Sequence, residues 1–151
     1  MQFNEVTLND KALFNSYLQG RKRNLITYCF SSFYLWREWD PYSWAIVEDA
    51  LVVKSNYKNL DTICVPISAD DQAVLRATEA MIEAYQQENK EFIISEVSAD
   101  DLLFYEKYWP GRFLSLIHIL FCCQCTCQLF IYYSMLYVYA DVLSRSFLGQ
   151  Y

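Results

Sequence analysis

The densest group of metal-ligating residues is the run Cys122-Cys123-Gln124-Cys125-Thr126-Cys127, which holds four of the six cysteines. In an extended strand, alternate cysteines of this run would share one face. Tetrahedral zinc sites, however, usually take two ligands from a second, distant pair, and the other two cysteines, Cys29 and Cys64, are single. We therefore predict an apolar role for the run and no metal site. The single histidine, His118, is not a catalytic candidate.

Charged groups offer two further candidate sites. The basic turn Arg21-Lys22-Arg23 could contact phosphate. It also follows a predicted helix end, where cations are favoured by the helix dipole without any ligand. The adjacent Glu48 and Asp49 fall at a predicted turn, where we expect both carboxylates to be solvated. Acid–base catalysis needs carboxylates that are buried or that converge on one point. We keep the basic turn as the candidate phosphate contact and assign no catalytic residue.

A cofactor of the acetyl-CoA type would need consecutive backbone N–H groups in a glycine-rich loop at a helix start. The three glycines, Gly20, Gly111 and Gly149, each stand alone. No cofactor is therefore predicted.

The elements that must position any site show clear patterns before Phe113. The pairs Thr7/Asp10 and Ser98/Asp101 resemble capping boxes that open helices. Apolar residues recur at helical or strand spacing between them. Strands are predicted at 3–6, 44–47, 50–53, 63–67 and 92–97, and helices at 8–18, 32–36, from 70–71 to about 85, and 98–107.

This order of elements predicts a mixed α/β (α+β) fold with a largely antiparallel sheet and flanking helices. The aromatic stretch from Tyr28 to Trp44 is interpreted mainly as core, with base stacking or bilayer contact as the alternative. Cys29 and Cys64 are also expected in the core. The residues that we expect to be buried are Trp36, Leu51, Val53, Val74, Met81, Ile82, Ile94 and Leu102.

The chemistry of the chain changes at Phe113. From Phe113 to Ala140 there is no charged residue, and Asp141 and Arg145 are the charged residues after it. The net charge of −6 therefore lies wholly before Phe113. An acidic body binds nucleic acid poorly without specific contacts.

Five motifs up to Phe113 follow one another in a characteristic order and spacing: Thr7-Leu8-Asn9-Asp10-Lys11, Phe30 to Trp36, Glu48 to Val53, Pro66, and Tyr108 to Phe113. Together they resemble the opening of the phosphatidylglycerol lysyltransferase C-terminal domain family. The resemblance covers residues 1–113.

The resemblance implies a tandem of two acetyltransferase-like (GNAT-like) folds, of which this chain matches the first. Family members of known activity transfer an aminoacyl group from charged tRNA to a lipid head group. The resemblance thus implies aminoacyl-tRNA and lipid as partners of an intact parent protein. The chain departs from the family at Leu114: Tyr137-Val138-Tyr139 resembles a Tyr-Val-Tyr strand, but no Lys-Arg-Asn helix start follows. We expect an incomplete fold that lacks its catalytic half and is inactive alone.

Residues 114–151 form an apolar, Cys- and Tyr-rich tail that we expect to lie outside the core. Its start, Leu114-Ser115-Leu116-Ile117-His118-Ile119, resembles the translation of a transposase adapter used in sequencing libraries, so an assembly or frameshift artefact is one interpretation. The other is real protein. In that case residues 114–140 exceed the length of about 20 residues that spans a bilayer, although Gln124, Thr126 and Gln128 interrupt them.

Two functions from different classes stay open. The first is a truncated aminoacyltransferase-like protein. The second is a small non-catalytic binding module anchored to a membrane by the tail. Because the N-terminus lacks the basic and apolar regions of a signal peptide, we expect a cytoplasmic protein, with membrane association through residues 114–140 as the alternative.

Overall fold

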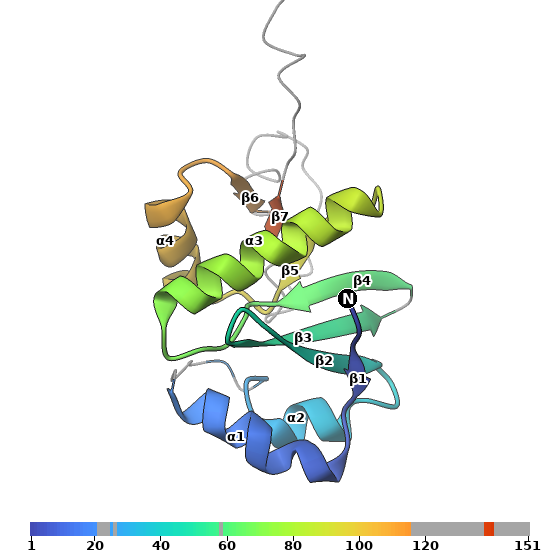
Figure 1. Ribbon diagram of the computed structural model, residues 1–151. Coiled ribbons are helices and arrows are strands. Elements are labelled where there is room, and N and C mark those ends of the chain that lie inside the picture. Colours follow the sequence, from blue (N-terminus) through green and yellow to red (C-terminus); the bar gives the residue numbers. More distant parts are fainter. Residues whose placement is uncertain (21–24, 26, 58, 116–137, 141–151) are drawn as a thin grey trace, which may run out of the picture.

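The computed structural model describes residues 1–20, 25, 27–57, 59–115 and 138–140. Over these residues the chain forms one mixed sheet with helices on both faces (Figure 1). Its strands are β1 (Asn4–Glu5), β2 (Tyr42–Val47), β3 (Ala50–Tyr57), β4 (Leu60–Cys64), β5 (Ile93–Ser95), β6 (Phe113–Ser115) and β7 (Val138–Ala140). Its helices are the 3-10 helix η1 (Leu8–Asp10), α1 (Lys11–Gly20), α2 (Phe30–Leu35), α3 (Asp71–Gln87) and α4 (Ala99–Tyr108).

The strands lie in the order β1-β2-β3-β4-β5-β7-β6. Strands β4 and β5 run parallel, and the other neighbouring pairs are antiparallel. In Figure 1, α1 and α2 lie below the sheet, and α3 and α4 lie above it. The fold is thus α+β, with the largely antiparallel sheet and flanking helices predicted from the sequence.

Both predicted capping boxes are confirmed. The Thr7 backbone N–H donates a hydrogen bond of 2.7 Å to Asp10 Oδ2. At the start of α4, the Ser98 N–H donates to Asp101 Oδ2 and the Asp101 N–H donates to Ser98 Oγ, both at 3.1 Å. These exchanges satisfy N–H groups that a helix start leaves without intrahelical partners.

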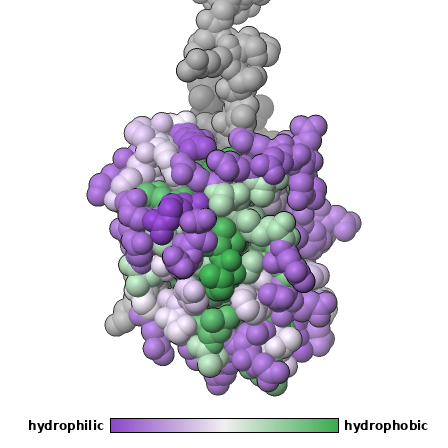
Figure 2. Space-filling model, viewed as in Figure 1, coloured by the Kyte–Doolittle hydropathy of each residue, from purple (hydrophilic) through white to green (hydrophobic). Residues whose placement is uncertain are grey.

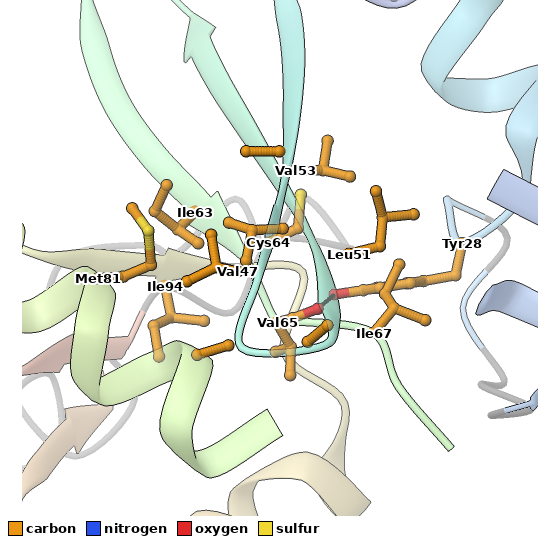
Figure 3. Packing of buried hydrophobic residues seen from close by; sticks show 14 of the residues in the cluster. Tyr28, Val47, Leu51, Val53, Ile63, Cys64, Val65, Ile67, Met81 and Ile94 are labelled. Atoms are coloured by element: carbon orange, nitrogen blue, oxygen red, sulfur yellow. Dashed lines mark hydrogen bonds between the residues drawn. The ribbon is translucent and has the colours of Figure 1, made fainter. Parts of the chain in front are cut away.

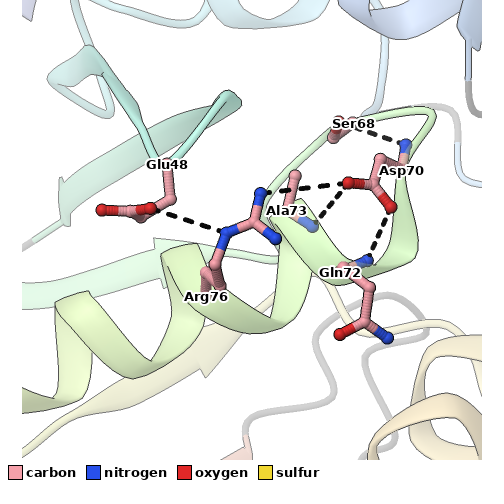
Figure 4. A network of polar contacts seen from close by, with 6 residues as sticks. All are labelled: Glu48, Ser68, Asp70, Gln72, Ala73 and Arg76. Atoms are coloured by element: carbon pink, nitrogen blue, oxygen red, sulfur yellow. Dashed lines mark hydrogen bonds and ion pairs between the residues drawn. The ribbon is translucent and has the colours of Figure 1, made fainter.

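Helix α3 begins where the side chain of Asp70 accepts hydrogen bonds from the backbone N–H groups of Gln72 and Ala73. Arg76, one turn further on, lies 3.9 Å from Asp70 Oδ2 and 3.5 Å from Glu48 Oε2 (Figure 4). Glu48 belongs to the predicted turn between β2 and β3, where Asp49 also has a positive φ. The contact therefore connects the hairpin turn to the first turns of α3.

The apolar core packs on both faces of the sheet (Figure 3). Figure 3 shows Met81 of α3 beside Ile63 and Ile94, whereas Tyr28 lies near Leu51 and Ile67. Six of the side chains expected in the core are buried, as predicted: Leu51, Val53, Val74, Met81, Ile82 and Ile94. On the outer surface, Figure 2 shows a strip of apolar side chains between hydrophilic ones.

Three burial predictions are wrong. Trp36 is 61% exposed, because α2 ends at Leu35 and its buried stripe consists of Phe30 and Phe33. Cys29 directly precedes that helix and is exposed, whereas Cys64 is buried as expected. Leu102 is only half-buried, because Asp101 and Tyr105 occupy the buried face of α4.

The predicted strand at 63–67 lies further along the chain than the observed β4. Beyond Cys64 the backbone leaves β4, and Ile67 instead exchanges two hydrogen bonds of 2.9 Å with Leu51. Pro66 lies between Cys64 and Ile67 and has no N–H to donate to a strand ladder.

The sheet extends past the boundary expected at Phe113. Strand β6 begins at Phe113, and β7 lies between β5 and β6, with Ile94 opposite Val138 and Ser115 opposite Val138 on the other side. The segment that resembles a Tyr-Val-Tyr strand therefore does form a strand over residues 138–140. The cysteine run and the rest of the tail lie outside the described residues.

Candidate functional site

A polar pocket opens on the α2 side of the sheet. Strands β2 to β5 and the residues that flank them build it. The ring of Phe33 in α2 packs 5.3 Å from the ring of Tyr42, which places the pocket on the face that α2 partly covers. Its lining consists of Asp40, Tyr42, Ser55, Tyr57, Leu60, Thr62, Cys64, Ser95 and Glu96.

Strand register brings these polar side chains together. Tyr42 lies opposite Ser55, Ser55 lies opposite Thr62, and Cys64 lies opposite Ser95. Residues directly opposite each other in a sheet point to the same face. The Thr62 and Ser95 hydroxyl oxygens are 3.0 Å apart, and Cys64 Sγ lies 4.0 Å from Ser95 Oγ. A continuous polar row thus crosses a sheet whose other residues are mainly apolar.

Asp40 closes one side of the pocket. It follows α2, lies just before β2 and is only 9% exposed. The Ser55 hydroxyl donates a hydrogen bond to Asp40 Oδ1. Burial first, and then negative charge at Cys64 and Asp40, raise the pKa of the neighbouring Tyr42 well above its usual value. The Tyr42 phenol therefore keeps its proton and acts as a hydrogen-bond donor.

Glu96 closes the other side. It follows β5, is 5% exposed and has a φ of 56°, a conformation sparsely populated by residues other than glycine. Thr27 Oγ1 donates a hydrogen bond of 2.7 Å to Glu96 Oε2. Burial raises the pKa of Glu96, the Thr27 hydrogen bond opposes that shift, and the charge of Asp40 adds to it.

The pocket is rich in hydrogen-bond acceptors and negative charge. In the described part of the chain, its lining contains two buried carboxylates, three hydroxyls, two phenols and a thiol, but no lysine, arginine or histidine. Such a lining suits a small ligand with hydrogen-bond donors. It does not suit a phosphate.

Among the described residues, none of the charged groups considered as site candidates from the sequence lines this pocket. Arg21, Lys22, Arg23 and the cysteine run lie outside the described residues. Glu48 and Asp49 are exposed at the hairpin turn, as expected. Asp40 and Glu96 were not predicted; the available signal was polar residues inside apolar strand patterns, such as Ser55, Thr62 and Ser95.

The described residues include neither a metal-ligand cluster nor a long apolar helix. No three His, Cys, Asp or Glu side chains among them are grouped to hold a metal ion. None of the helices described here has the length and apolar content to cross a bilayer.

Comparison with known proteins shows the fold alone. No family model matches the sequence, and no curated protein matches it. A crystal structure of a conserved protein of unknown function from Bacteroides thetaiotaomicron VPI-5482 is similar, with a TM-score of 0.67 and 24% identity over 76% of this chain. The chain spans 38% of the length of that protein.

Proposed function

We propose that this chain is the first acetyltransferase-like fold of an aminoacyltransferase-type protein, whose intact form moves an aminoacyl group from charged tRNA to a lipid head group. The observation that carries the proposal is the polar pocket, with two buried carboxylates, on one face of the largely antiparallel sheet. A buried, acceptor-lined pocket is suited to orienting a small polar group. The sequence motifs of the phosphatidylglycerol lysyltransferase C-terminal domain family supply the reaction class.

From the lining of the same pocket we infer that this chain alone transfers no aminoacyl group. Aminoacyl transfer from tRNA requires a surface that collects phosphate charge and groups that stabilise a developing oxyanion. The pocket offers no surface that collects phosphate charge, because its charged side chains are the carboxylates of Asp40 and Glu96. We propose that the basic groups for tRNA come from protein beyond this fold. The longer similar protein from Bacteroides thetaiotaomicron has room for them.

An aminoacyl-transfer assay tests the proposal. The purified chain and the full-length Bacteroides thetaiotaomicron protein are each incubated with labelled lysyl-tRNA or alanyl-tRNA and phosphatidylglycerol vesicles, beside a protein-free control. We expect labelled lipid from the longer protein and none from this chain. Labelled lipid from this chain would contradict its inactivity, and no product from either protein would count against the transferase class.

A second candidate function is a membrane-associated binding module, and one surface favours it. Leu35, Trp36 and Trp39 are 68%, 61% and 77% exposed around the end of α2. The guanidinium of Arg37 lies 3.8 Å from the centre of the neighbouring Tyr34 ring. Tryptophan beside a cation is typical of membrane–water interfaces.

Vesicle co-sedimentation separates this candidate from the first. If the surface binds membranes, the double variant Trp36→Ala/Trp39→Ala should lose binding to phosphatidylglycerol vesicles. Leu103→Ala is the matched control, because Leu103 is 71% exposed on α4. Equal binding by the double variant and the control would exclude this surface.

A further inference from the structure

We propose that the pocket between Asp40 and Glu96 binds the protonated primary amine of a small ligand. This inference deepens the proposed function and rests on it for the role of the ligand. The binding itself can be measured without any transfer reaction.

Charge is the first argument. The two carboxylates are 9% and 5% exposed, and no basic side chain lines the pocket within the described residues. Two buried carboxylates are costly when both are ionised, and a cation beside them reduces that cost. An ammonium group that enters the pocket supplies this cation.

Hydrogen-bonding capacity is the second argument. Asp40 accepts hydrogen bonds from Ser55 and from the Tyr42 phenol, and Oε2 of Glu96 accepts one from Thr27. An ionised carboxylate can accept several hydrogen bonds, and an ammonium has three N–H donors and no acceptor. Charge-assisted bonds of this kind are about twice as strong as neutral ones. The acceptors therefore match the type of donor that a primary amine carries.

The pocket also provides for the organic part of such a ligand. Tyr57 and Leu60, which end β3 and begin β4, are 43% and 44% exposed at its rim. Aromatic and aliphatic side chains there can contact a short carbon chain, and a cation is attracted to the face of a tyrosine ring. A small aliphatic amine fits this combination better than an inorganic cation.

The proposal has a consequence for pH. The titratable groups that line the pocket are Asp40, Tyr42, Tyr57, Cys64 and Glu96. Tyr42 stays neutral because its pKa is raised, so it does not change charge in the acid range. Protonation of Glu96, whose pKa is raised, removes one of the two negative charges. Amine affinity should therefore fall as pH falls through the pKa of Glu96.

Calorimetric titration of the full chain tests the proposal with two amines. Glycinamide represents the α-amine of an aminoacyl donor, and ethanolamine represents a lipid head-group amine. N-acetylglycinamide, which lacks the ammonium, is the neutral control. We expect at least about tenfold tighter binding of one or both amines than of the neutral control. The stronger of the two identifies the ligand source.

Variants locate the binding. Asp40→Asn and Glu96→Gln should each weaken amine binding by about tenfold or more, whereas Asp61→Asn should not, because Asp61 lies outside this pocket. If a pocket variant fails to fold, the pH dependence of amine binding to the unaltered protein decides the question.

Four results would overturn the amine site: equal binding of the neutral control, undiminished binding by folded Glu96→Gln, affinity independent of pH, or complete displacement of the amine by equimolar Mg²⁺. Amine binding without transfer by the longer similar protein would instead support the site and reject the transferase proposal.

Discussion

At the scale of single residues, Glu96 carries the most unusual environment among the described groups that titrate in the acid range. It is buried, its φ is positive, and Asp40 adds negative charge to its surroundings. The hydrogen bond from Thr27 is too weak to reverse the effect of burial, because the pKa of Glu96 is still raised. A buried carboxylate of this kind is more typical of a binding or catalytic site than of a structural ion pair.

The raised pKa of Glu96 predicts how stability depends on pH. Because the folded protein holds this proton more tightly than the unfolded chain does, Glu96 contributes stability below its unfolded pKa, and that stability is lost as pH rises through its folded pKa. Glu96→Gln stays neutral and should remove this loss. We expect the variant to gain stability relative to the unaltered protein as pH rises from the unfolded pKa of Glu96 through its folded pKa.

Urea denaturation at a series of pH values measures this difference. Glu91→Gln, an exposed glutamate just before β5, is the matched control and should leave the pH profile unchanged. A profile of Glu96→Gln parallel to that of the unaltered protein would contradict the prediction.

The residues of the pocket were harder to predict than the capping boxes at the helix starts. Thr7/Asp10 and Ser98/Asp101 could be predicted because a capping box is complete within four consecutive residues. Asp40 and Glu96 are 56 positions apart in the sequence, and they line one pocket only because the strands pair in a particular register. Their burial depends on that register, which the local patterns of the sequence do not reveal.

At the scale of elements, a buried hydroxyl pair connects α3 to α4. Thr78 Oγ1 donates to the Val74 carbonyl at 2.8 Å and lies 3.0 Å from the Tyr105 hydroxyl. Thr78 and Tyr105 are 0% and 1% exposed. The Tyr105 hydroxyl therefore donates to Thr78, and the bond helps fix the position of α4.

We expect Tyr105→Phe to lower the free energy of unfolding by about 1 kcal/mol, the usual net value of one hydrogen bond. Thr78→Val removes the other partner, so a double-mutant cycle isolates the coupling between them. Chemical denaturation of the four proteins measures it. Ser16→Ala, on the exposed side of α1, is the control and should change stability little. Additive effects of the two substitutions would contradict a direct bond.

Elements were predicted well where the pattern is long and local. The helix that starts at Asp70-Asp71 follows a three-and-four spacing over many residues, and α3 confirms it. The aromatic stretch was predicted less well, because its aromatic residues fall on more than one helical face and do not reveal which face is buried. The structure buries Phe30 and Phe33 and exposes Trp36 and Trp39.

At the scale of the whole molecule, the described core is contained in the first part of the chain. Among the described residues, the buried hydrophobic side chains run from Val6 to Tyr105. The strands after them, β6 and β7, are three residues each; β7 pairs with β5, and β6 pairs with β7 at the edge of the sheet. Residues 1–113 thus contain strands β1 to β5 and all the helices that the structure describes. The pairing of β5 with β7 needs residues beyond them.

We therefore expect a protein that ends at Phe113 to fold on its own. Its free energy of unfolding should be within the range of roughly 5–15 kcal/mol of small domains, although below that of the full chain, because β5 becomes an unpaired edge. Urea denaturation followed by far-ultraviolet circular dichroism and by tryptophan fluorescence should give one coincident transition. A protein that ends at Gln87 is the control: it lacks β5 and α4, including Ile94 and Tyr105, and should not unfold cooperatively. If the protein that ends at Phe113 also lacks a cooperative transition, the residues beyond it are part of the folding unit and the boundary expected from the sequence is wrong.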